Sequence, residues 1–121
     1  MGRAPKRCKR VDIDNLIRGT VWASRPHADY IYRCGGKAVV VEDTGRPEYR
    51  DLEKVEHSIE MIRSSNIIGD AVVAGVVHYK RSDTMFNKMA VRRASRRPPI
   101  LPANCYDKLR KIIRELLGCN C

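Results

Sequence analysis

The chain has 121 residues, 43% of them hydrophobic and 31% charged, a length that allows one domain with a modest core and excludes two independent ones. Its 24 Lys and Arg residues outnumber 14 Asp and Glu residues, so with a net charge of +10 nucleic acid is the first partner to consider, a solvated basic surface being the alternative. Neither a membrane-length apolar run nor the apolar segment of a secretory signal is visible, so we expect a cytoplasmic protein with no membrane partner.

The N-terminal residues are predicted to form a basic arm followed by a short helix. Residues 1–10 are basic and show no periodicity, which is typical of an arm. Residues 11–19 carry apolar side chains at helical spacings and end in Gly19, a pattern that predicts a helix. Residues 20–24, with the sequence TVWAS, are the candidate for a first strand.

A β-hairpin is predicted next. Residues 29–34 and 37–43 are rich in β-branched and aromatic residues, and two glycines separate them. A two-residue turn of this kind needs positive φ angles, which glycine adopts without steric cost. With this turn, Asp29 lies directly opposite Glu42 on one face of the hairpin.

The remaining chain alternates between helical and strand-like patterns. Helices are predicted where apolar residues recur every three or four positions, and a strand where a short apolar run is rich in valine. The predicted elements are a helix over 46–66, a buried strand over 71–79, a helix over 83–95, an extended linker over 96–102 and an amphipathic helix over 104–118.

This order of elements predicts an α/β (α+β) fold, in which a small mixed β-sheet is flanked by helices. We divide the chain into the basic arm of residues 1–10, an α/β core of residues 11–91, and a basic linker with the C-terminal amphipathic helix in residues 92–121. The last helix carries more apolar residues than one small domain needs, which suggests a homodimer through that helix.

The two opposed carboxylates of the hairpin need compensation, because like charges directly opposite each other on a sheet are destabilising. A bound Mg²⁺ or Mn²⁺ would supply it, since such a cation takes one or two carboxylates and leaves other positions to water and phosphate. Thr44 lies on the same strand face as Glu42. The alternative is that Asp29 and Glu42 are solvated at the open end of the hairpin and paired with Arg25 or Arg46.

The stretch ADYIY...KAVVVEDT, within an αβββαβ order of elements over about residues 10–80, resembles the PD-(D/E)XK nuclease superfamily, whose core is restriction-endonuclease-like. The Asp of the family's motif matches Asp29 and its Glu matches Glu42, which the resemblance implies are the metal ligands. The family's Lys falls on Thr44, a departure from the motif. Some members supply the basic residue from the following helix, and Lys54 is the candidate here.

The resemblance implies a Mg²⁺- or Mn²⁺-dependent nuclease that hydrolyses phosphodiester bonds of DNA or RNA, with Asp29, Glu42, Lys54 and Thr44 in its catalytic site. The alternative is a non-catalytic nucleic-acid-binding protein with a nuclease-like fold that acts in a larger assembly. In either case basic side chains contact the phosphates. The candidates are Arg46, Arg50, Lys80, Arg81, Arg92, Arg93, Arg96 and Arg97.

The five cysteines are Cys8, Cys34, Cys105, Cys119 and Cys121. The chain contains no glutamine and many charged residues, which favours a thermophilic source, and some thermophile cytosols hold disulfides. Disulfides, free thiols and metal ligands remain open, but an iron-sulfur cluster is not expected because the C-x2-C spacing is missing. Cys34, on a predicted strand, is expected to be a small buried hydrophobe.

The histidines and aromatic residues give no strong indication of a functional site. His27 precedes Asp29 by two residues and is a weak candidate for a phosphate contact, His57 is expected to face solvent, and His78 is expected to be structural. With Trp22 as its one tryptophan, the sequence does not predict base stacking.

Overall fold

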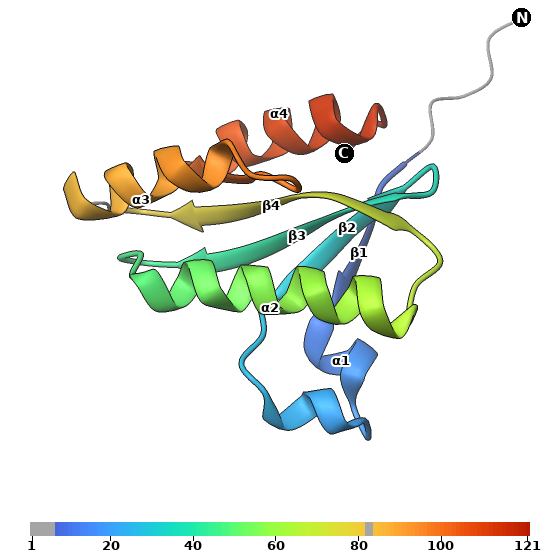
Figure 1. The fold of residues 1–121 in the computed structure, drawn as a ribbon. Coiled ribbons are helices and arrows are strands. Elements are labelled where there is room, and N and C mark those ends of the chain that lie inside the picture. Colours follow the sequence, from blue (N-terminus) through green and yellow to red (C-terminus); the bar gives the residue numbers. More distant parts are fainter. Residues whose placement is uncertain (1–6, 82–83) are drawn as a thin grey trace, which may run out of the picture.

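A five-stranded mixed sheet, in the order β1-β2-β3-β4-β5, is the centre of the computed structural model, which describes residues 7–81 and 84–121 (Figure 1). β2 pairs antiparallel with both β1 and β3. β4 pairs parallel with both β3 and β5. The strands are β1 (Lys9–Asp12), β2 (Tyr30–Cys34), β3 (Lys37–Thr44), β4 (Ala71–Tyr79) and β5 (Ile100–Ala103). This is the α+β fold with a small mixed sheet that the sequence predicted.

Helices cover both faces of this sheet, with α2 on one face and α4 on the other (Figure 1). The α2 helix approaches β4 so closely that a Cβ at position 75 would lie 2.3 Å from Val55 Cγ1, so only glycine fits there. The helices are α1 (Ile13–Ile17), the 3₁₀ helix η1 (Val21–Ser24), α2 (Tyr49–Ser65), α3 (Thr84–Ala94) and α4 (Tyr106–Leu117).

The β2–β3 hairpin has the predicted turn and register. Gly35 and Gly36 both have positive φ angles, 60° and 81°, as a two-residue hairpin turn requires. The pairing runs from Cys34 opposite Lys37 to Tyr30 opposite Val41. Asp29 and Glu42 are the next residues, so the two carboxylates lie at the end of the hairpin far from its turn.

The segment before the hairpin differs from the prediction. The predicted helix over 11–19 is wrong at its start, because residues 11 and 12 belong to β1 and only Ile13–Ile17 are helical. The predicted strand over 20–24 is also wrong, since these residues form η1. The Thr20 side chain caps that turn by accepting a hydrogen bond from the Trp22 amide at 3.2 Å, and this local bond overrides the strand propensity.

The predicted linker over 96–102 is partly a strand. Residues 100–103 form β5, which pairs with β4 from Gly75 opposite Ile100 to His78 opposite Ala103. Ile100 and Ala103 are buried, 3% and 0% exposed, so their burial supports pairing that the prolines obscured in the sequence. Pro102 is tolerated because β5 is an edge strand.

Two disulfides tie the C-terminus to the rest of the chain: Cys8–Cys121 links it to the residue before β1, and Cys34–Cys119 links it to the end of β2. Cys34 is buried, as expected, but it is bonded to Cys119 and does not serve only as a small hydrophobe. Cys105 is exposed and is the one free cysteine among the described residues. The predicted arm is wrong for residues 9 and 10, which form the start of β1, and its residues 1–6 lie outside the described residues.

The apolar side of α4 packs against the sheet. Leu109, Ile113 and Leu117 are buried against β2, β3 and β4, and Ile112 and Leu116 are partly buried in the same cluster. A homodimer through this helix stays a prediction, but the surplus apolar face that suggested it is covered. Among the described residues no helix has the length and apolar character to cross a bilayer.

Candidate active site

A buried carboxyl group lies at the centre of the candidate site. Glu42 is 2% exposed, on the side of β3 that α2 covers. Its side chain shares a hydrogen bond with the carboxyl group of Asp29, which is exposed. The strand pairing ends at Tyr30 opposite Val41, so the predicted direct opposition of Asp29 and Glu42 falls just beyond it. The two side chains nevertheless meet there, one buried and one open to solvent.

Hydrogen bonds of Asp29 and of the residue before it fix its position. Its amide donates to the Val41 carbonyl at 3.1 Å, and its Oδ2 accepts from the Asp43 amide at 2.6 Å, so Asp29 is bonded to both neighbours of Glu42. The preceding amide, of Ala28, donates to Ser58 Oγ on α2 at 2.7 Å. Helix α2 and β3 together thus hold the loop that carries the carboxylate.

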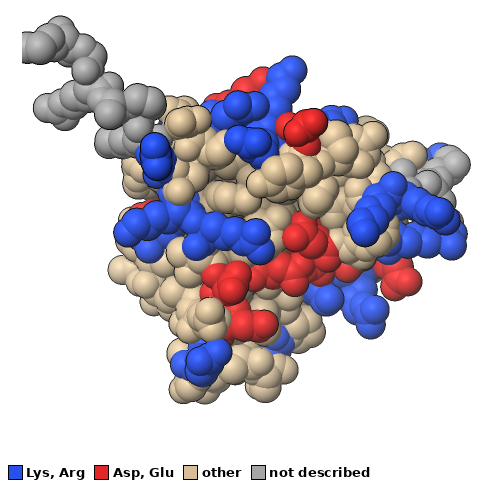
Figure 2. All heavy atoms as spheres, turned by 180° about the vertical axis from the view of Figure 1, so that it is seen from behind, with Lys and Arg blue, Asp and Glu red and all other residues tan. Residues whose placement is uncertain are grey.

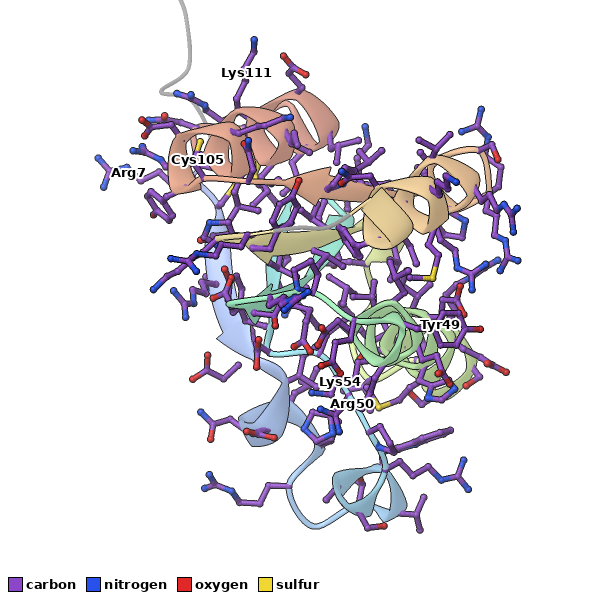
Figure 3. All side chains as sticks on the ribbon, turned by 90° about the vertical axis from the view of Figure 1, so that its left-hand side faces the viewer. Arg7, Tyr49, Arg50, Lys54, Cys105 and Lys111 are labelled. Atoms are coloured by element: carbon purple, nitrogen blue, oxygen red, sulfur yellow. A yellow bond between two sulfur atoms is a disulfide. The ribbon has the colours of Figure 1, made fainter. Side chains whose placement is uncertain are left out.

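Lys54 forms an ion pair with the buried carboxyl group. Its Nζ lies 3.3 Å from Glu42 Oε2, and its side chain is 32% exposed, so it contacts the buried carboxyl group and solvent alike. In Figure 3 the labelled Lys54 and Arg50 lie to the left of α2, whereas Tyr49 lies to its right. The Thr44 hydroxyl donates to the Arg46 carbonyl at 3.4 Å, within the turn that follows β3.

The electrostatics of Glu42 favour its protonated form. Burial, together with the hydrogen bond and negative charge of Asp29, raises the pKa of Glu42 from 4.5 to about 8, although Lys54 acts in the opposite direction. A second cation beside the two carboxyl groups would stabilise the ionised form of Glu42. Two carboxylates beside solvent are a donor set that suits a hard divalent cation such as Mg²⁺ or Mn²⁺, although the described residues include no group of three or more His, Cys, Asp or Glu side chains that could together hold a metal ion.

A second polar cluster lies on the opposite face of the same sheet end. Asp43 Oδ1 accepts from the Tyr30 hydroxyl at 3.1 Å and lies 2.9 Å from His78 Nδ1. The Tyr106 ring of α4 lies 6.4 Å from the His78 ring. Sequence reasoning missed Asp43 and treated His78 as structural. The available signal was strand alternation, which places Asp43 on the face opposite to Glu42.

Two of the predicted phosphate contacts lie beside the turn that follows β3. The Gly45 carbonyl accepts hydrogen bonds from the amides of Lys80 and Arg81, both at 3.0 Å. This brings those two residues, which follow β4, next to Arg46. Arg50 lies in the first turn of α2, 3.9 Å from Glu48.

The arginines in α3 and just after it differ in their contacts. Arg93 is only 12% exposed, and its Nε lies 2.6 Å from Glu56 Oε1 in an ion pair that lacks hydrogen-bond geometry. Arg96 lies 3.3 Å from the same carboxylate. These two therefore join α3 to α2, while Arg92 and Arg97 are exposed.

The surface around the site combines both charges. Figure 2 shows acidic side chains gathered in the middle of one face, with Lys and Arg side chains on both sides of them. A divalent cation is attracted to the acidic centre and phosphate groups to the basic margins. Comparison of the chain with family models, with curated proteins and with solved structures gives no match.

Proposed function

We propose that the protein is a metal-dependent nuclease, a variant member of the PD-(D/E)XK superfamily, that hydrolyses phosphodiester bonds of DNA or RNA. The observation that carries the proposal is the buried Glu42 carboxyl group, which shares a hydrogen bond with Asp29 and has Lys54 Nζ at 3.3 Å. A buried carboxyl group with a strongly raised pKa, next to a second acid and a lysine at the surface, is costly to maintain and is typical of a functional site.

Each residue has a separate role in this proposal. Asp29 and Glu42 would hold Mg²⁺ or Mn²⁺, which supplies charge neutralisation for the phosphate and makes water more acidic. Lys54 would orient the attacking water and balance negative charge that develops on the phosphate, taking the place of the motif lysine that Thr44 replaces. The hydrogen bonds to Val41, Asp43 and Ser58 act only through the position of Asp29 and its loop.

Basic side chains would position the nucleic acid. Lys80 and Arg81 lie beside the turn that follows β3. Glu42 is located on that strand, two residues before its end. Each phosphate they contact releases counterions, so affinity should fall as salt is added. Arg93 and Arg96 contribute less, because both are paired with Glu56.

Calorimetric titration of Mn²⁺, combined with cleavage assays on labelled DNA and RNA, tests the proposal. We expect Glu42→Gln to abolish Mn²⁺ binding and cleavage, and Lys54→Met to retain Mn²⁺ binding but lower the cleavage rate by at least about 100-fold. The matched controls are Glu115→Gln and Lys111→Met, two exposed positions on α4 that should behave like the wild type.

The result that would overturn the proposal is a folded wild-type protein that neither binds Mn²⁺ nor cleaves any form of DNA or RNA. Binding of nucleic acid under the same conditions would then favour the non-catalytic alternative. Equal loss of activity in Glu42→Gln and Glu115→Gln would also count against it, because a general effect of charge would explain both.

A further inference from the structure

A cavity of about 280 Å³ lies between the segment that follows α1 and one side of α2. It adjoins the loop that carries Asp29 but contains none of the residues assigned to metal or phosphate binding. Its walls carry aromatic, apolar and polar side chains. The lining residues include Trp22, Arg25, His27, His57, Glu60 and Met61.

The first wall of the cavity offers a flat surface. The Arg25 guanidinium carbon lies over the Trp22 ring, 4.9 Å from its centre, so the indole and the planar cation form a stacked pair. His27 is fixed by its bonds, because Nδ1 lies 2.7 Å from the Arg25 carbonyl and Nε2 is paired with Asp14. The position of Trp22 is set by the capping bond of its amide to Thr20.

The second wall belongs to α2 and is polar at its rim. His57 and Glu60 are exposed residues of this helix, and Met61 is buried beside them. A histidine and a carboxylate together supply hydrogen-bond donors and acceptors. The cavity therefore pairs a stacking surface on one side with hydrogen-bonding groups on the other.

The cavity neighbours the candidate active site along the chain and along α2. The hydrogen bond from the Ala28 amide to Ser58 Oγ lies between the two, with Asp29 on one side and His27 on the other. Along α2, His57 follows Lys54 by three residues and Met61 follows it by seven, which corresponds to a rise of roughly 5 to 10 Å. A nucleotide next to a phosphate held at Lys54 would reach this space.

We propose that this cavity binds one unpaired nucleobase of the nucleic acid, stacked against the Trp22–Arg25 pair and hydrogen-bonded at its edge by His57 and Glu60. The inference rests on the proposed function for the identity of the ligand. The volume is nearly twice the about 150 Å³ of a cavity that holds benzene, so one heterocyclic base fits. A base within a duplex is not available for such stacking, so the substrate class is single-stranded nucleic acid or nucleic acid with an extrahelical nucleotide.

The intrinsic fluorescence of Trp22 measures this directly, because the chain has a single tryptophan. A single-stranded DNA 12-mer and its blunt duplex are titrated into the wild-type protein in EDTA, so that no cleavage occurs. We expect the single strand to quench Trp22 and the duplex to leave it nearly unchanged. Anisotropy of a labelled single strand should show at least about fivefold weaker binding for Trp22→Leu and for His57→Ala.

Two variants separate stacking from damage to the fold. Trp22→Phe keeps an aromatic ring and should retain most of the affinity that Trp22→Leu loses. Tyr49→Leu removes an exposed aromatic residue from the other side of α2 and should bind like the wild type.

The cavity proposal fails if the single strand and the duplex bind equally without quenching, or if Trp22→Leu and Tyr49→Leu behave alike. These outcomes leave the nuclease proposal standing wherever Mn²⁺-dependent cleavage is observed. Conversely, quenching by the single strand without any cleavage supports the cavity and refutes the catalytic proposal.

Discussion

At the scale of single residues, Glu42 is a carboxyl group that the protein buries although water would solvate it better. Its partner across the sheet on β4 is Val77, and the contacts that offset the burial are one hydrogen bond with Asp29 and one ion pair with Lys54. Loss of solvation on burial is only partly repaid by such contacts. The stability of the metal-free protein should therefore depend on whether Glu42 carries a proton.

We predict a pH dependence of stability that Glu42→Gln reduces. Because burial raises the pKa of Glu42 from 4.5 to about 8, the folded state holds a proton that the unfolded state has released, and stability is lost as pH rises through this window. Urea unfolding in EDTA at pH 5 and pH 9 should show the wild type losing on the order of 2–4 kcal/mol more than Glu42→Gln between these pH values.

Adding Mn²⁺ at pH 9 should restore the stability of the wild type but not of Glu42→Gln, because only the ionised carboxylate is a ligand. Parallel stability curves for the two proteins across the whole pH range would show that Glu42 is not the group responsible.

Sequence reasoning reached Asp29 and Glu42 because a two-glycine turn fixes the register of a hairpin, and that register places the two residues next to its last pair, Tyr30 and Val41. It did not connect Asp43 with His78. These two meet across the parallel pairing of β3 and β4, whose register depends on how α2 packs on the sheet and not on a local turn.

At the scale of elements, the loop before β2 depends on α2 for its position. Ser58 is 0% exposed, accepts from the Ala28 amide at 2.7 Å and donates to the Lys54 carbonyl at 2.8 Å. One hydroxyl group thus joins the loop of Asp29 to the helical turn that follows Lys54. No sequence motif marks this serine, because its partner lies 30 residues away.

We predict that Ser58→Ala lowers both stability and metal affinity. The Ala28 amide would be left buried without its partner, which costs about 1–3 kcal/mol, and Asp29 would lose one of its supports. Urea unfolding and Mn²⁺ titration measure the two effects. Ser64→Ala on the same helix is the control, because the Ser64 hydroxyl bonds only within α2, to the Met61 carbonyl at 3.3 Å. Equal changes in both variants would exclude the proposed link between helix and loop.

The elements that sequence patterns predicted well are those with strong periodicity, namely α2, α4 and the strand of residues 71–79. Residues 20–24 look like a strand by propensity, but Thr20 caps a 3₁₀ turn. Residues 100–103 look like a linker because of their prolines, but tertiary burial of Ile100 makes them an edge strand. In both cases an interaction outside the local pattern decides the structure.

At the scale of the whole molecule, the first described residues meet the C-terminal residues, because the Cys8 amide donates to the Asn120 carbonyl at 3.3 Å. Cys34, next to the turn of the β2–β3 hairpin, is bonded to Cys119. The disulfides Cys8–Cys121 and Cys34–Cys119 span 113 and 85 residues, so each closes most of the chain into a loop. Sequence alone could not give this pairing, because five cysteines allow several. Cross-links over long loops restrict the unfolded chain strongly and stabilise the folded state.

The Cys34–Cys119 disulfide and the carboxyl pair lie at opposite ends of the same hairpin. Removal of the disulfide should therefore change the stability of the protein without changing its metal affinity. Cys34 follows Asp29 by five residues of extended chain, about 17 Å. The double variant Cys34→Ser with Cys119→Ser should lower the free energy of unfolding by about 2–4 kcal/mol but leave Mn²⁺ affinity within about twofold of the wild type, because the strands that position Asp29 and Glu42 keep their pairing. Cys105→Ser, at the exposed free cysteine, should change neither quantity. Loss of Mn²⁺ binding in the double variant, with the protein still folded, would show instead that the cross-linked end of the sheet controls the geometry of the site.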